Sequence, residues 1–198
     1  MKMKRYLVYA AIITLAACGG KDEKPKVEDI PQAPLAKSKN SPAFNASFEK
    51  VLDDYFHLKD NFITEKDTTI NFYARKMMYD ADSLKLNELK GDPAIIETAK
   101  SYATSMSSEL KGLSGEKDLQ AKRKSFNMLT DQLYNLLRTV QYDREVIYHQ
   151  HCGMAFDEKD GDVNAYWLSR SNDIKNPYLP KKMLTCGDVP DSLDYRPK

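Results

Sequence analysis

Apolar residues recur at helical spacing through the first two thirds of the chain, in four stretches. The first begins after Ser41, a capping residue that precedes proline. The second begins at Thr64, which has the capping-box spacing to Asp67. The third and fourth follow Asp92 and Gly115. The apolar positions, stretch by stretch, are Phe44, Phe48, Val51, Leu52, Tyr55, Phe56 and Phe62; Ile70, Tyr73, Ala74, Met77, Ala81 and Leu84; Ile95, Ile96, Ala99, Tyr102, Ala103, Met106 and Leu110; Leu119, Phe126, Leu129, Leu133, Leu136, Leu137 and Val140.

Four helices of about 20 residues joined by short loops predict an up-down four-helix bundle over residues 41–142. The stripes lack the paired Glu-x-x-His elements of a di-iron carboxylate centre. Met77, Met78, Met106 and Met128 are spaced through these stretches and are expected to fill the core. The bundle is therefore expected to be a scaffold.

The pattern changes after residue 142. Residues 146–148 and 165–168 are rich in β-branched and aromatic side chains and predict short strands. We expect a mainly α fold in which residues 143–198 form a small, partly β appendage, packed on one end of the bundle. Trp167 is expected to form the core of this appendage.

The N-terminus predicts export. Three basic residues precede the apolar run Tyr6–Ala17, which is too short to cross a bilayer, so residues 1–17 are predicted to be a signal peptide. Its end, Leu15-Ala16-Ala17-Cys18, resembles the lipobox of bacterial lipoproteins. That resemblance implies cleavage before Cys18 and lipidation of the Cys18 sulfur. The alternative is an ordinary signal peptide followed by a chance cysteine.

Residues 18–40 are rich in lysine, glutamate and proline and predict a flexible, lipidated tether. Within it, Lys21-Asp22-Glu23 resembles the acidic surface-export signal of Bacteroidetes lipoproteins. We therefore expect a cell-envelope protein that is held in the membrane by the lipid on Cys18 and faces the periplasm. Display at the cell surface is the alternative.

Composition narrows the function further. Among 198 residues, 30 basic side chains balance 29 acidic ones, so no strong field favours nucleic acid. A mean hydropathy of −0.62 with one apolar run excludes a polytopic membrane protein. The chain contains no Gly-x-Ser-x-Gly, phosphate-binding glycine loop or His-Glu-x-x-His motif, so no catalytic residue is predicted.

Potential metal ligands are concentrated in the C-terminal region. They are His149, His151, Cys152, Met154, Met183 and Cys186. Thiolate and thioether sulfurs suit Cu(I), with imidazole as an acceptable neighbour. Cys152 and Met154 are two positions apart, so an extended segment points both to one side. Met183 and Cys186 could converge on a turn. These four sulfurs predict a soft-metal site, with the histidines as direct or outer ligands.

A structural disulfide is the alternative. Lipidation of Cys18 leaves Cys152 and Cys186, and two cysteines in an exported domain commonly pair. Closing a loop of about 35 residues would stabilise the fold by roughly 3–4 kcal/mol on the chain-entropy model. The residue pattern leaves both interpretations open.

The C-terminal motifs resemble one family. They are Tyr148-x-x-x-Cys152-Gly153-Met154-Ala155, Trp167-Leu168-Ser169, Ile174, Asn176-Pro177-Tyr178 and Met183-Leu184-x-Cys186-Gly187. This pattern is similar to a domain-of-unknown-function family of Bacteroidetes exported lipoproteins, which also occurs as a C-terminal extension of periplasmic adaptors of heavy-metal efflux pumps. The resemblance covers roughly residues 41–189, with its specificity in 148–187.

Two positions depart from that family. Gly153 stands where the family usually has proline between cysteine and methionine, and Pro180 follows Leu179 where glycine is common. The resemblance implies a membrane-anchored protein that holds copper(I) or a similar ion for sequestration or for hand-off to heavy-metal efflux components. The competing hypothesis is a disulfide-stapled interaction or structural module of the cell envelope.

Overall fold

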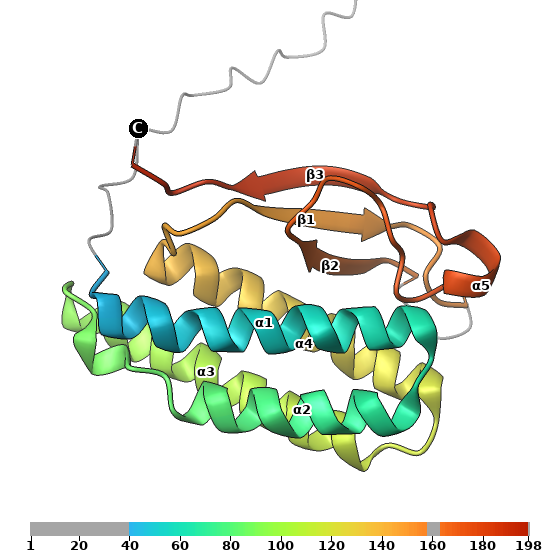
Figure 1. Ribbon diagram of the computed structural model, residues 1–198, viewed down its shortest axis with the longest axis horizontal. Coiled ribbons are helices and arrows are strands. Elements are labelled where there is room, and N and C mark those ends of the chain that lie inside the picture. The colour runs from blue at the N-terminus through green and yellow to red at the C-terminus, as the bar shows by residue number, and fades with distance from the viewer. Residues whose placement is uncertain (1–39, 158–162, 198) are drawn as a thin grey trace, which may run out of the picture. The chain divides into compact units, whose positions relative to one another are not determined.

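The computed structural model describes residues 40–157 and 163–197. The predicted signal peptide (1–17) and Cys18 lie outside the described residues, as does the predicted tether except for Asn40. Four long helices and a small sheet make up the described part (Figure 1). No helix in it is long and apolar enough to cross a membrane.

The four helices are α1 (Pro42–Thr64), α2 (Asp67–Asp82), α3 (Pro93–Gly115) and α4 (Leu119–Val140). A short 3-10 helix, η1 (Leu86–Glu88), lies between α2 and α3. Consecutive helices pack side by side, which confirms the up-down bundle (Figure 1).

Side chains cap three of the helices. The Ser41 hydroxyl accepts from the Phe44 N–H at 3.1 Å, and Asp92 accepts from the Ala94 N–H at 2.8 Å. Asp118 caps α4. Such caps satisfy N–H groups that have no partner within the helix, which fixes where each helix begins.

The predicted capping box at Thr64 is wrong. Thr64 is the last residue of α1, and its hydroxyl donates to the Asn61 carbonyl at 3.4 Å. Glu65 then adopts a left-handed conformation with φ 54°, and α2 begins at Asp67 without a side-chain cap. Since Thr64 is helical itself, its hydroxyl is directed back into α1 and does not cap α2.

The predicted stripes form the core, with two corrections. Met77 and Met106 are fully buried, but Ile95 and Met128 are 44% and 52% exposed. Met128 lies two positions from the buried Phe126, which places it on the opposite side of α4. Ile95 lies in the first turn of α3, which begins at Pro93.

The C-terminal region forms a three-stranded antiparallel sheet. Its strands are β1 (Ile147–Cys152), β2 (Ala165–Ser169) and β3 (Asp188–Leu193), in the order β2-β1-β3. The first two match predicted strands, whereas β3 and the short helix α5 (Pro180–Met183) were not predicted. β3 is a mostly exposed edge strand that contains proline, so it lacks the apolar alternation of a buried strand.

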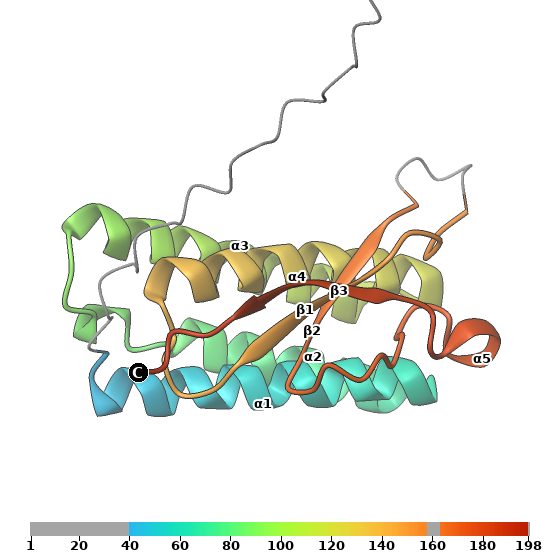
Figure 2. The ribbon, with the colours of Figure 1, turned by 90° about the horizontal axis from the view of Figure 1, so that it is seen from above.

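The sheet packs along the side of the bundle, so the prediction that it caps one end is wrong. The unpaired edge of β2 lies against α1 and α4 (Figures 1 and 2). The Tyr166 N–H donates to Asn127 Oδ1 at 2.8 Å, and the Leu168 N–H donates to Tyr55 Oη at 3.0 Å. Buried strand edges need such partners, and mid-helix side chains provide them here. Trp167 is fully buried, as predicted, in a core shared with the helices.

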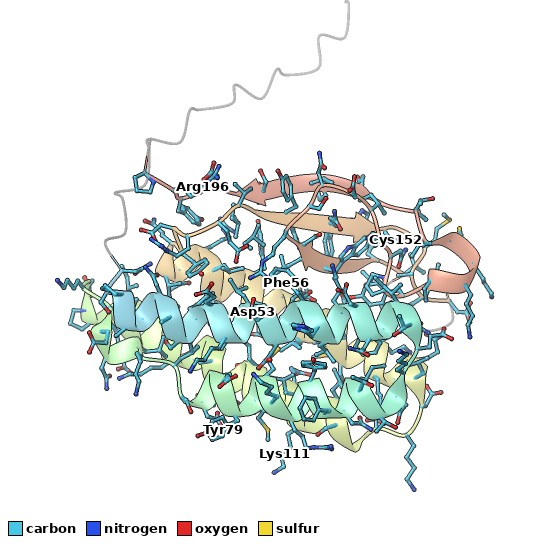
Figure 3. All side chains as sticks on the ribbon, viewed as in Figure 1. Asp53, Phe56, Tyr79, Lys111, Cys152 and Arg196 are labelled. Carbon is cyan, nitrogen blue, oxygen red and sulfur yellow. The ribbon has the colours of Figure 1, made fainter. Side chains whose placement is uncertain are left out.

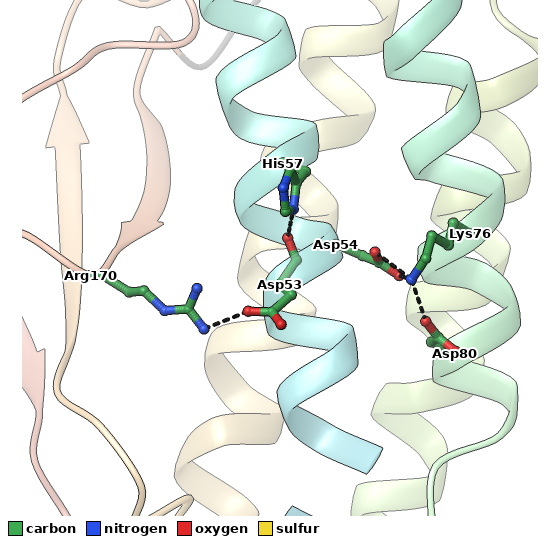
Figure 4. Close-up of polar contacts among 6 residues, drawn as sticks. All are labelled: Asp53, Asp54, His57, Lys76, Asp80 and Arg170. Atoms are coloured by element: carbon green, nitrogen blue, oxygen red, sulfur yellow. Dashed lines mark hydrogen bonds and ion pairs between the residues drawn. The ribbon is translucent and has the colours of Figure 1, made fainter. Parts of the chain in front are cut away.

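Two adjacent acidic residues connect α1 to different neighbours (Figure 4). Asp54 is buried against α2 and pairs with Lys76 at 2.7 Å; Lys76 also reaches Asp80 at 2.9 Å. Burial raises the pKa of Asp54 to about 6. Asp53 faces the other way and pairs with Arg170, which follows β2, at 2.7 Å. The pair of acids therefore ties α1 to both α2 and the sheet region.

Candidate functional site

The two C-terminal cysteines meet at one end of the sheet. Cys152 ends β1 and is 1% exposed (Figure 3). Cys186 lies just before β3 and is half-buried. Their sulfurs are 3.5 Å apart although the residues are 34 positions apart in sequence. Both are free thiols. The sequence-predicted pair is therefore brought into contact.

Gly187 makes this meeting possible. Its φ of +151° is one that side chains rarely adopt, and a Cβ there would lie 2.6 Å from the His151 carbonyl oxygen and 2.9 Å from the Trp167 ring. Glycine alone lets the segment before β3 approach β1 this closely. Cys186, the preceding residue, is thereby carried to the end of β1.

Asn176 holds the Cys186 segment from the other side. Its Nδ2 donates to the Cys186 carbonyl at 3.0 Å, and its own N–H donates to the Leu184 carbonyl at 2.8 Å. Its Oδ1 accepts from the N–H groups of Tyr178 and Leu179 at 2.8 and 3.1 Å. Asn176 is fully buried. It therefore uses both ends of its amide to fix the loop that carries Cys186.

Asparagine followed by proline is typical of a turn, and Tyr178 follows directly after this pair. Tyr178 is buried, and its hydroxyl donates to the Tyr166 carbonyl at 2.6 Å. The link from Asn176 to Cys186 was missed. Its only sequence signal is an asparagine before proline, a type that commonly bonds nearby backbone, and this pattern does not indicate a contact ten residues away.

Arg123 ties this loop to the bundle. It is 3% exposed on α4, and its Nε donates to the Pro177 carbonyl at 3.1 Å. Its Nη2 pairs with Glu65, at the end of α1, at 3.1 Å. The buried guanidinium therefore joins two helices and the Asn-Pro-Tyr turn. The loop that carries Cys186 is therefore attached to the bundle through Arg123.

The Cys186 thiol favours its protonated form. The hydrogen bond to the Cys152 thiol raises the pKa of Cys186, with partial burial adding to the shift. A protonated thiol is a poor nucleophile and must lose its proton to bind a metal. Ligand binding at this site is therefore coupled to proton release.

The two methionines differ in their relation to the thiols. Met183 ends α5, is half-buried, and its carbonyl accepts from the Cys186 N–H at 3.1 Å. Met154 follows β1 in a turn and is 59% exposed. Met183 is thus tied to Cys186 through the backbone, whereas the Met154 side chain is largely in solvent.

The two histidines differ in their surroundings. His149 is stacked between Tyr134 and Tyr166, with ring centroids 4.1 and 4.8 Å away. Burial lowers the pKa of His149 to about 4. His151 uses Nδ1 to contact Asp188 at 2.9 Å and Nε2 to contact Asn164 at 3.0 Å. His151 would have to give up one of these contacts to ligate a metal.

Within residues 40–157 and 163–197, no group of three or more histidine, cysteine or acidic side chains is arranged to hold a metal ion. A complete site would therefore need thioether sulfur or a rearranged histidine beside the thiols. The two sulfurs are 3.5 Å apart. If each formed a bond of about 2.3 Å to one metal ion, the sulfur–metal–sulfur angle would be roughly 100°. That angle leaves room for further ligands.

One family model, described as "Protein of unknown function (DUF3347)", matches residues 51–145. The match is to an uncharacterised family. It begins within α1 and ends just before β1, so it covers most of the bundle and none of the six candidate ligands. The resemblance was expected to be most specific in residues 148–187, but the matched region is the helical one. No curated protein and no solved structure matches the chain.

Proposed function

We propose that the protein is an exported lipoprotein, anchored through Cys18, that binds a soft heavy-metal ion, Cu(I), at Cys152 and Cys186. The observation that carries this proposal is the 3.5 Å separation of the two sulfurs. Gly187 and Asn176 hold the two segments together before any metal arrives, so little ordering is required on binding. Thiolate pairs are preferred ligands of Cu(I).

The proposed site is completed by thioether sulfur. Met183 is next to Cys186 through a backbone hydrogen bond, and Met154 lies two residues beyond Cys152. Cys186 and Met183 are half-buried and Met154 is exposed, which gives a partner access to one edge of the site. Such an edge suits transfer of the ion to another sulfur-rich protein. The proposed role is therefore sequestration of copper or hand-off to efflux components.

The sulfur separation also favours a second candidate, a disulfide-stapled module of the cell envelope. A disulfide needs a sulfur separation of about 2.05 Å, so the thiols would have to move together by roughly 1.5 Å. Forming the bond removes two protons and two electrons, which a disulfide-carrying oxidoreductase of the envelope would accept by thiol–disulfide exchange. The oxidised chain would bind partners through its surface and hold no metal.

Anaerobic copper titration of the full chain distinguishes these roles. We expect native mass spectrometry to find one Cu(I) per chain, and a competing Cu(I) chelator to report the affinity. Cys186→Ala should abolish stoichiometric binding, because one thiolate is lost. Met154→Leu should weaken binding. Met128→Leu, which changes a similarly exposed methionine on α4, should bind as the unchanged chain does.

Three results would contradict the metal proposal. One is an isolated chain about 2 Da lighter than its sequence that takes up no copper after mild reduction, which would support the disulfide module. The second is copper binding that survives Cys186→Ala. The third is an equal loss of affinity in Met154→Leu and Met128→Leu.

Membrane attachment is tested separately. Cys18→Ala should abolish incorporation of labelled palmitate and release the chain from the membrane fraction, because the lipid is the proposed anchor. Retention of label in Cys18→Ala would contradict the lipoprotein assignment. This experiment does not involve the C-terminal thiols, so it can fail without affecting the copper result.

A further inference from the structure

A cleft of about 370 Å³ lies between α1 and the segment that follows β2. Phe56, His57 and Lys59 line it from α1, and Arg170 and Lys175 line it from the segment. Figure 4 shows Arg170 reaching across toward Asp53 of α1. The cleft is lined by none of the candidate metal ligands.

Lys59 is the unusual side chain in this cleft. It is 8% exposed, and its ammonium pairs with the exposed Asp60 at 3.4 Å and lies over the Phe56 ring, 5.8 Å from the centroid. Burial lowers the pKa of Lys59, and the positive charges of Lys175 and Arg170 lower it further. Burying an ammonium is costly when its acidic partner is itself exposed, and an anion in the cleft would compensate the charge further.

Arg170 is held in a fixed position at the cleft wall. Its guanidinium stacks over the Phe56 ring at 4.5 Å. Its Nε bonds Glu145 at 2.6 Å, and its Nη2 bonds Asp53 at 2.7 Å. Among the residues that the structure describes, none forms a hydrogen bond with the third guanidinium nitrogen, Nη1. The remaining donors are therefore positioned in advance.

The segment that carries Arg170 is also fixed by hydrogen bonds from β1 and within itself. Gln150 is fully buried in β1, and its Nε2 donates to the carbonyls of Ser171 and Asp173 at 2.9 and 3.1 Å. The Ser171 N–H donates to the Ser169 hydroxyl at 3.2 Å. These bonds hold the segment that carries Arg170 and Lys175. The cleft keeps its shape without a ligand.

We propose that this cleft binds a single phosphate group through Lys59, Arg170 and Lys175. A tetrahedral phosphate presents oxygens in several directions, which suits cationic donors that come from different elements better than a planar carboxylate does. Asp60 and Asp173 also line the cleft, and their charge opposes a polyphosphate. The ligand is free phosphate or the phosphate of a small organic ester.

Amide NMR titrations of the full chain test this proposal. The probes are inorganic phosphate and glycerol phosphate, with acetate at matched ionic strength for comparison. We expect saturable shifts confined to residues 56–60 and 169–175. Lys59→Met should weaken phosphate binding by about tenfold or more, because a desolvated charged donor is lost. Lys100→Met, on the exposed face of α3, should leave the affinity unchanged.

Folding and binding are separated by a second measurement. Lys59→Met should not lower the free energy of unfolding without phosphate, because an apolar chain of similar length replaces a costly buried charge. If Lys59→Met does not fold, Lys175→Gln is the variant to use in its place. It changes an exposed cleft residue and should also weaken phosphate binding.

The outcomes decide the source of the phosphate as well. Saturable binding of inorganic phosphate supports a free ion, and binding of glycerol phosphate alone supports an organic ester. Shifts of equal size with acetate, equal weakening in Lys100→Met, or no saturable shift with either phosphate would each overturn the proposal.

Discussion

The bundle and the sheet are stabilised in different ways. The helices pack through apolar stripes between neighbours in sequence. The sheet shares this core through residues such as Trp167 and Leu168, and it is also joined to the helices by polar contacts across long distances in sequence. One of these is the bond from Leu168 to Tyr55, which are 113 positions apart. The placement of the sheet therefore depends on individual polar atoms in addition to apolar packing. Because all six candidate ligands lie in the sheet region, their geometry depends in part on those atoms.

This contrast can be measured with two signals. The only tryptophan, Trp167, is buried in β2, so its fluorescence reports on the sheet. Far-ultraviolet circular dichroism is dominated by the four long helices. Coincident transitions in urea would indicate one cooperative unit, and separate transitions would indicate that the sheet is lost first.

Gly187→Ala should have the largest effect. A Cβ at this position meets backbone 2.6 Å away, which no side-chain rotation relieves. We expect a loss of about 3 kcal/mol or more in the stability of the sheet. In urea, the Trp167 transition should move to a much lower concentration, and the helical signal should move less.

Gly153→Ala is the matched control, since its Cβ would make only ordinary contacts, at 3.7 Å. It should leave both transitions close to those of the unchanged chain. A small effect of Gly187→Ala would contradict the close approach. Equal shifts of both signals in Gly187→Ala would show that bundle and sheet unfold together.

His149 should make the sheet sensitive to acid. Its pKa is about 4 in the folded chain and about 6.5 when unfolded, so only the unfolded chain takes up the proton as the pH falls from 6.5 to 4. The contribution of His149 to the free energy of unfolding is therefore fully present above pH 6.5. It falls by about 1–3 kcal/mol as the pH is lowered to 4.

His149→Phe keeps an aromatic ring in the stack between Tyr134 and Tyr166 and removes the titration. The variant should lose less stability than the unchanged chain between pH 6.5 and 4, as measured by urea unfolding at each pH. The raised pKa of Asp54 makes the folded chain more stable as the pH falls, which is opposite to the effect of His149. Asp54 is present in both chains, so its contribution cancels in the comparison. Parallel pH profiles would contradict the assignment.

Tyr55→Phe tests the junction between the regions. The Tyr55 hydroxyl lies 2.7 Å from the Thr130 hydroxyl and accepts from the Leu168 N–H at 3.0 Å. Its removal leaves a buried N–H without a partner, so we expect a loss of about 1–2 kcal/mol, read first by Trp167 fluorescence. Tyr79→Phe, 71% exposed on α2, should change nothing measurable. Equal effects of the two would contradict the role of this bond.

The same contrast explains what the sequence could predict. Periodic apolar residues such as Phe48, Leu52 and Met77 predict the helices, because burial of a helix face leaves a repeating pattern. β3 leaves no such pattern, because it is an exposed edge strand that pairs on one side. The packing of the sheet along the side of the bundle depends on the hydroxyl of Tyr55. In the sequence, Tyr55 falls at the helical spacing of an ordinary core residue, so nothing marks this role.

The candidate site shows the same limit. The residue types at Cys152 and Cys186 predict that the two could meet, through either metal or disulfide chemistry. The parts that bring them together, the close approach at Gly187 and the buried amide of Asn176, involve residues distant in sequence and have no periodic signal. Ligand types are therefore predictable from the sequence, whereas the contacts that position them are not.

Gly112→Ala should have the smallest effect and the opposite sign. Gly112 lies inside α3, and a Cβ there would meet nothing within 4 Å. Alanine lowers the conformational entropy of the unfolded chain and favours the helix, so we expect a gain of about 0.5–1 kcal/mol in urea unfolding. The same exchange that disrupts the sheet at Gly187 thus stabilises the bundle at Gly112, because one glycine is required by contact and the other is not. A loss of stability at Gly112 would show that the bundle too depends on specific close contacts.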